Sequence, residues 1–183
     1  MRKLLLSIVA ASMTLAACNA QSGYKVTGTV EGMPDGKAII ATVNGSSLDT
    51  LAKADVKNGS FEFTGNVSEP TGAYIMVIPF MLENANITVN AGQAGLTVTG
   101  SEGQKIYDQF MAINTTTQQE AMKLQQEYQA ANGDQAKMQA VQEAYAKLMT
   151  DAQAKETELI KANPDSYVST FVIVSGMGQM EYE

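Results

Sequence analysis

Leu96-Thr97-Val98-Thr99-Gly100-Ser101-Glu102-Gly103-Gln104-Lys105-Ile106 is the stretch in which the hydrophobic period of the chain changes. Before Gly100, apolar and polar residues alternate, which is typical of strands. After it, apolar residues recur three or four positions apart, which is typical of an amphipathic helix. Ser101 and Gln104 have the spacing of a capping box, in which the Ser hydroxyl accepts a hydrogen bond from the first helical turn. We therefore predict an α+β fold that changes from strands to helices at this point.

Residues 24–100 are predicted to form an antiparallel β-sandwich or barrel of about eight short strands. The expected strands are residues 24–30, 37–44, 48–56, 61–65, 74–78, 81–83, 87–90 and 96–99. Asn58-Gly59 is the strongest turn signal, because both residues tolerate positive φ. It predicts that residues 61–65 pair with residues 48–56.

Residues 101–163 are predicted to form a long antiparallel helical hairpin that turns at Asn132-Gly133 and stops at Asn163-Pro164. Two apolar stripes support it: Ile106, Phe110, Ile113, Ala121, Leu124 and Tyr128, then Met138, Val141, Tyr145, Leu148, Ala152, Leu159 and Ala162. Because two helices cannot cover both stripes, we expect the apolar tail, residues 164–183, to pack against the hairpin or the sandwich. Two structures are open for this tail. The β-branched and aromatic residues favour a strand, whereas Asp165 or Ser166 could act as the N-cap of a short helix.

Residues 1–17 have the pattern of a lipoprotein signal peptide. Arg2 and Lys3 precede an apolar run, residues 4–15, that is shorter than the roughly 20 residues of a transmembrane helix. Leu15-Ala16-Ala17-Cys18 then predicts cleavage before Cys18 and lipidation of its thiol, with residues 18–23 as a tether. The alternative is an ordinary signal peptide followed by an accidental cysteine.

The predicted anchor places the protein in the cell envelope. Two or three acyl chains on Cys18 would hold it stably in a membrane. Asn19 follows the cysteine, and no Asp or Glu occurs before Glu31, so neither the inner-membrane retention signal nor an early acidic export signal is present. We therefore expect the periplasmic face of the outer membrane.

Composition excludes several functional classes. Removal of Arg2 and Lys3 leaves 10 basic and 19 acidic residues, a net charge of −9, which disfavours nucleic acid as a partner. The sequence has no His and a single Cys, so we expect no disulfide, no CxxC, no metal site and no cofactor. An enzyme that uses carboxylates alone, such as a glycosidase, lacks a recognisable catalytic pair. We expect no catalytic residues.

Two weaker patterns remain. Asp49-Thr50-Leu51 matches the short acceptor pattern of an O-glycosylation system in some Gram-negative anaerobes, which makes Thr50 a hypothetical glycosylation site. The pattern is short enough to arise by chance. The pairs Met76 with Met81 and Met177 with Met180 could mimic a copper site, although methionine more simply fills gaps in a core.

Several short motifs follow Cys18 in a characteristic order. They are Gly28-Thr29-Val30, Asn58-Gly59-Ser60-Phe61-Glu62-Phe63-Thr64-Gly65, Leu82-Glu83, Ile87-Thr88-Val89, Gly100-Ser101 and Asn163-Pro164-Asp165-Ser166. In this order, residues 24–175 resemble the uncharacterised domain-of-unknown-function family 4369. The resemblance implies a β-domain and helical hairpin that precede a thioredoxin-like domain, of the AhpC/TSA or TlpA/ResA type, in exported lipoproteins of Gram-negative anaerobes.

One departure from that family limits what the resemblance implies. The thioredoxin-like part, with its CxxC, would begin near Glu183, so no redox residue can be transferred, and we expect either a fragment or a member without that domain. The expected function is a membrane-anchored, non-catalytic accessory or binding module associated with a thioredoxin-like domain or protein. The alternative is a free-standing ligand-binding or envelope-assembly lipoprotein with no redox link.

Overall fold

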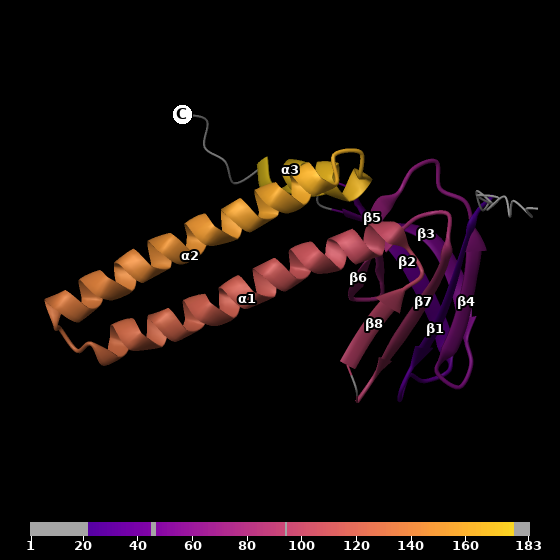
Figure 1. Cartoon of the computed structure of the whole chain (residues 1–183). Helices are drawn as coiled ribbons and strands as arrows, with labels where there is room; N and C mark the ends of the chain where they lie inside the picture. Colours follow the sequence, from indigo (N-terminus) through magenta and orange to yellow (C-terminus); the bar gives the residue numbers. More distant parts are fainter. Residues whose placement is uncertain (1–21, 45–46, 94, 178–183) are drawn as a thin grey trace, which may run out of the picture.

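The computed structural model describes residues 22–44, 47–93 and 95–177, and it confirms the α+β class (Figure 1). Its strands are β1 (Tyr24–Val30), β2 (Gly36–Asn44), β3 (Ser47–Val56), β4 (Ser60–Gly65), β5 (Thr71–Ile75), β6 (Ile78–Leu82), β7 (Asn86–Gly92) and β8 (Gly95–Thr99). Its helices are α1 (Glu102–Ala130), α2 (Gln135–Ala162) and α3 (Tyr167–Met177).

The strands form two four-stranded sheets, in the orders β4-β1-β7-β8 and β3-β2-β5-β6. The sheets do not close into a barrel. Of the two alternatives that we predicted, a sandwich or a barrel, the sandwich is therefore correct. The expectation of an entirely antiparallel domain is wrong, because β1 and β7 pair in parallel. Parallel neighbours need a crossover connection. Here the chain between them crosses to the second sheet and back twice.

The Asn58-Gly59 turn forms, but it does not join the two strands that we expected. Asn58 and Gly59 have φ values of 50° and 74°, as a tight turn requires. Only the bridge between Lys57 and Ser60 continues the pairing among the described residues, after which β3 and β4 separate into different sheets. The turn is therefore a corner between the sheets. β4 pairs with β1 instead, because that register places Phe61 and Phe63 in the core.

The apolar run of residues 74–78 is divided between two strands, which corrects our prediction of one. Met76, with a φ of 57°, turns the chain between β5 and β6, and Ile75 pairs with Ile78. The turn lets both strands direct alternate residues into the space between the sheets. Buried side chains from both sheets fill this space, among them Val26, Ile40, Ile75, Phe80, Leu82, Ile87 and Val89.

α1 begins by joining the open edges of the two sheets. It follows β8, at the edge of one sheet, and its first turns contact β6, at the edge of the other. The Ser101 hydroxyl caps the helix by accepting from the Gln104 backbone N–H at 2.9 Å, as predicted. The Gln104 side chain does not close the capping box. Its Oε1 instead accepts from the Met81 backbone N–H at 2.8 Å, a group that β6 would otherwise leave unpaired at its edge.

The apolar tail packs as a short helix, which confirms the helical alternative. The Ser166 hydroxyl accepts from the Val168 backbone N–H at 3.2 Å, and α3 begins at Tyr167. Val168 is buried with Met81 and Phe110 in a second cluster outside the sandwich. Phe171 lies against Gly72 of β5, where a β-carbon would approach its ring to 3.1 Å. Sheet, hairpin and tail therefore meet at one junction.

Beyond this junction, α1 and α2 project from the β-domain as an isolated pair (Figure 1). Asn132 and Gly133 turn the chain with positive φ, and the Asp134 side chain caps α2 by accepting from the Lys137 backbone N–H. α1 has only Gly103, Gln104 and Phe110 fully buried, all near the β-domain. α2, which the structure describes throughout, has no fully buried residue. The predicted apolar stripes are thus largely uncovered.

Gly59→Val should lower the free energy of unfolding by about 1–3 kcal/mol, because valine strongly resists positive φ. A β-carbon at this position would also lie 2.5 Å from the Val30 carbonyl oxygen. Gly32→Val is the matched control, since Gly32 has the same φ of 74° but nothing within 4 Å of its β-carbon position. Chemical denaturation should show a larger loss at Gly59. Equal losses would mean that the contact with Val30 does not matter.

Gln104→Leu should lower the free energy of unfolding by about 1–3 kcal/mol, because it leaves the buried Met81 N–H without an acceptor. Gln126→Leu, at an exposed position of the same helix, should change it by no more than about 0.5 kcal/mol. Urea titrations followed by circular dichroism measure both. A Gln104 variant as stable as the Gln126 variant would contradict the role of this hydrogen bond.

Candidate functional site

The two modification sites predicted from the sequence have different outcomes. Cys18, the expected lipidation site, lies outside the described residues. Thr50 lies on β3, an edge strand, where it pairs with Ala41 just after a register shift. Its side chain is exposed, so a modifying enzyme could reach it. O-glycosylation of Thr50 stays a prediction.

Metal chemistry finds no support among the described residues. No group of three or more His, Cys, Asp or Glu side chains in that part of the chain could hold a metal ion. Met81 is buried in the junction cluster, and Met76 packs against the sandwich core, so both fill space in the apolar interior. Met180 lies outside the described residues. Within the described part of the chain, no helix is long and apolar enough to cross a membrane.

A hollow of the described surface lies on the projecting hairpin, between α1 and α2. This feature, the hairpin groove, has a volume of about 660 Å³. Nine described residues line it: Gln118, Ala121, Met122, Leu124, Gln125, Tyr128, Val141, Gln142 and Tyr145. All nine are uncharged. An open, uncharged and mainly apolar groove suits the binding of another apolar surface.

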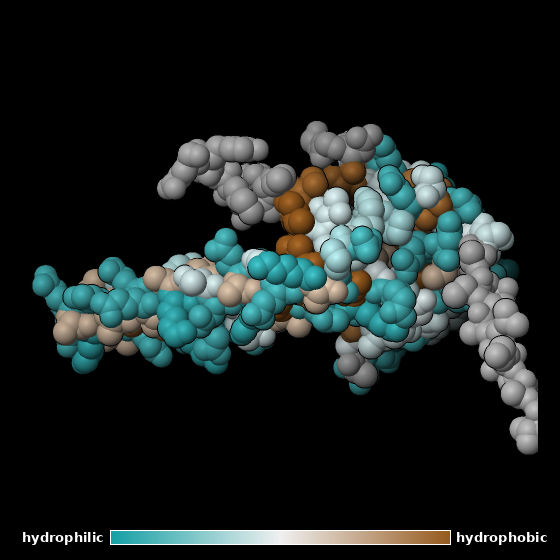
Figure 2. Space-filling view, turned by 45° about the horizontal axis from the view of Figure 1, so that its top comes forward, coloured by the Kyte–Doolittle hydropathy of each residue, from teal (hydrophilic) through white to brown (hydrophobic). Residues whose placement is uncertain are grey.

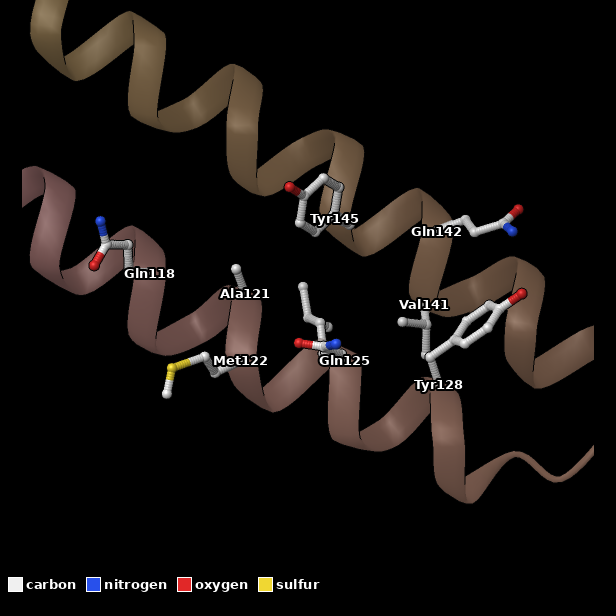
Figure 3. Close-up of a pocket in the computed structure, with 9 residues that line it drawn as sticks. Gln118, Ala121, Met122, Gln125, Tyr128, Val141, Gln142 and Tyr145 are labelled. Carbon is white, nitrogen blue, oxygen red and sulfur yellow. The ribbon is translucent and has the colours of Figure 1, made fainter.

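Side chains of both helices line the hairpin groove (Figure 3). Val141 and Tyr145 of α2 extend toward α1, and Tyr128 of α1 lies beside Val141. Met122 is 58% exposed and Tyr145 is 46% exposed, values that are high for large apolar side chains of a stable helical pair. The two helices therefore contact each other, but large apolar side chains on both of them remain exposed to solvent.

Charged side chains lie beside the hairpin groove and pair within their own helices. Lys123 Nζ lies 2.7 Å from Glu120 Oε1, and Lys147 Nζ lies 2.6 Å from Asp151 Oδ2. These i,i+3 and i,i+4 pairs neutralise each other locally. The groove thus offers amides, phenols, a thioether and alkyl groups, which suit binding rather than proton transfer.

A second, smaller hollow of about 190 Å³ lies at the junction, between α3 and the sheet. Tyr74, Tyr107 and Tyr167 contribute to its wall. Burial raises the pKa of the Tyr107 phenol, and the nearby Tyr74 and Asp108 side chains add to the rise. The Tyr107 phenol is therefore neutral at physiological pH and acts here as an aromatic packing group.

The outer side of the junction is also apolar. Figure 2 shows hydrophobic surface gathered where the hairpin meets the β-domain, over α3. Val174 of α3 is 63% exposed and Val43 of β2 is 57% exposed. We refer to Val43 and Val174 with the adjoining Phe171 as the junction patch.

The sequence analysis did not identify the hairpin groove, because it expected the apolar tail to cover what two helices leave open. In the structure the tail packs at the junction, and Tyr128, Val141 and Tyr145 line an open groove. One signal was available in the sequence. Two stripes on two helices, followed by a single short apolar tail, leave more apolar surface than the chain can cover.

Comparison with known proteins concerns the β-domain. The family model of Domain of unknown function (DUF4369) matches residues 24–107, which include all eight strands and the first turns of α1. The hairpin groove lies outside the matched residues. No curated protein and no solved structure matches the chain detectably. The match thus identifies residues 24–107 of this chain, the β-domain and the start of α1, as a DUF4369 domain.

Proposed function

We propose that the protein is a lipid-anchored lipoprotein of the cell envelope, on the periplasmic face of the outer membrane, that acts by binding and not by catalysis. The hairpin groove is the observation that carries this proposal. Its lining is uncharged, and a pair of projecting helices holds it away from the β-domain. A surface of this kind is typical of a protein-binding element.

The anchor fits the geometry of the β-domain. Ser22 is held to the fold, since its carbonyl oxygen accepts from Asn66 Nδ2 at 2.6 Å. Residues 19–21 separate Cys18 from Ser22, and the four residue steps from Cys18 to Ser22 span at most about 14 Å. A lipid on Cys18 would therefore keep the β-domain close to the membrane surface. β1 and β4 lie on the side of the sheet away from β8 and α1, so the hairpin would extend from the opposite side.

The family resemblance supports a thioredoxin-like domain or protein as the partner. We propose that this partner contacts the junction patch, because the patch is apolar, exposed and formed in part by α3. The alternative is a free-standing ligand-binding or envelope-assembly lipoprotein with no redox link. It is favoured by the position of the hairpin groove, which lies outside the residues that match the family model.

Cys18→Ala tests the anchor. The substitution removes the thiol that would accept the diacylglycerol, so the variant should lose all incorporation of a fatty-acid analogue during metabolic labelling. The parent should be labelled and should fractionate with the outer membrane. Label retained on the alanine variant, or an unlabelled parent, would reject the lipoprotein proposal.

A photoreactive amino acid at Val174 tests the thioredoxin link in the native envelope. We expect an adduct with a thioredoxin-fold protein, identified by mass spectrometry, because Val174 is an exposed apolar residue of the junction patch. The same probe at Gln126, an exposed polar position of α1, is the control and should give no such adduct. Adducts at both positions, or at neither, would favour the free-standing alternative.

A further inference from the structure

We propose that two copies of this chain pair through their hairpin grooves to form a four-helix bundle, so that the lipoprotein acts as a homodimer. The proposal rests on the proposed function, since it identifies the partner of the same groove. It concerns the projecting part of the hairpin, residues 118–149. The junction patch is not part of it and stays open to another protein.

The first argument is that the hairpin is an incomplete bundle. α2 has no fully buried residue over its whole described length, although its sequence carries a regular apolar stripe. Met122, Tyr145 and Met149 are 58%, 46% and 40% exposed, respectively. In a four-helix bundle every helix buries an apolar stripe against neighbours on two sides. A second hairpin supplies the two missing helices.

The second argument is charge. The whole chain has a net charge of −7, which would oppose association of two copies over most of the surface. Residues 118–149 contain four acidic and three basic side chains, which gives this region a net charge of −1. All three basic side chains form ion pairs with acidic residues three or four positions away in the sequence. The projecting part of the hairpin is therefore a nearly neutral region in which two copies would not repel each other.

The lining of the hairpin groove is also complementary to a second copy of itself. Gln118, Gln125 and Gln142 each carry a donor and an acceptor, so the amides of one copy can pair with those of another. A strongly charged partner would find no complementary charge in the lining. An anionic lipid surface would require an excess of Lys and Arg on the apolar helices, which this part of the chain lacks. Self-association requires neither.

The third argument is area. Residues 135–149, the part of α2 in this region, form a helical segment about 22 Å long, and two helices side by side are about 20 Å wide. The face that each copy offers is then roughly 450 Å², about half of what each partner buries in a standard stable interface. We therefore infer a weak dimer that forms where the chains are concentrated, as they would be on one membrane.

Sedimentation equilibrium of the full-length lipidated protein in nonionic detergent tests the proposal. Micelles are kept in excess over protein, so that two chains do not share a micelle by chance. The parent should show a monomer–dimer equilibrium that shifts to the dimer as the protein concentration rises. Met122→Glu with Tyr145→Glu should raise the dimer dissociation constant by roughly 100-fold or more, because two carboxylates per chain would be buried without partners. Gln126→Glu with Gln153→Glu adds the same charge at exposed positions outside the groove lining and should keep the monomer–dimer equilibrium of the parent.

A photoreactive amino acid at Met122 gives a second measurement that does not depend on how the glutamate variant folds. In the native envelope, it should yield an adduct of two copies of this chain, whereas the probe at Gln126 should not. A monomeric parent, an unchanged dissociation constant in the double variant, or adducts with other proteins alone would overturn the homodimer. Adducts with another protein would leave the proposed function standing, whereas an absence of any adduct at both Met122 and Val174 would reject it as well.

Discussion

One buried hydrogen bond joins the two halves of this protein, between the Met81 backbone N–H and the Gln104 side chain. β6 is the edge of its sheet, so the Met81 N–H has no strand to pair with. Gln104 supplies the acceptor from the first turn of α1, while the Ser101 hydroxyl caps the same turn. Because both contacts act within a few residues, they set the direction in which the helix leaves the sandwich.

The position of everything after Gln104 depends on that direction. Phe110, one turn and a half further along α1, packs with Met81 and with Val168 of the returning tail. Phe110 is the last fully buried residue of α1. Beyond it the helices have only each other, so their outer stripes face water. The hairpin groove and the junction patch are both consequences of a core that ends early in the helical region.

A protein that keeps such surfaces exposed gains from being held in place. The proposed lipid on Cys18 would confine the chain to a membrane and hold the β-domain against it, with the hairpin extended from the opposite side. In the proposed arrangement the apolar faces would meet neighbouring proteins in the same envelope rather than dilute solution. The sandwich would then serve as a rigid base, and the helices, with α3, would carry the binding surfaces.

The sequence by itself determined the local structure. It placed the strand-to-helix change at Gly100, the turns at Asn58-Gly59 and Asn132-Gly133, and the cap at Ser101, because each depends on a few neighbouring side chains. Tertiary structure decided the rest. It separated β3 from β4, set β1 parallel to β7 and turned Gln104 toward Met81. It also left Tyr145 in water, because burial is decided by what other segments cover a stripe, and periodicity does not contain that information.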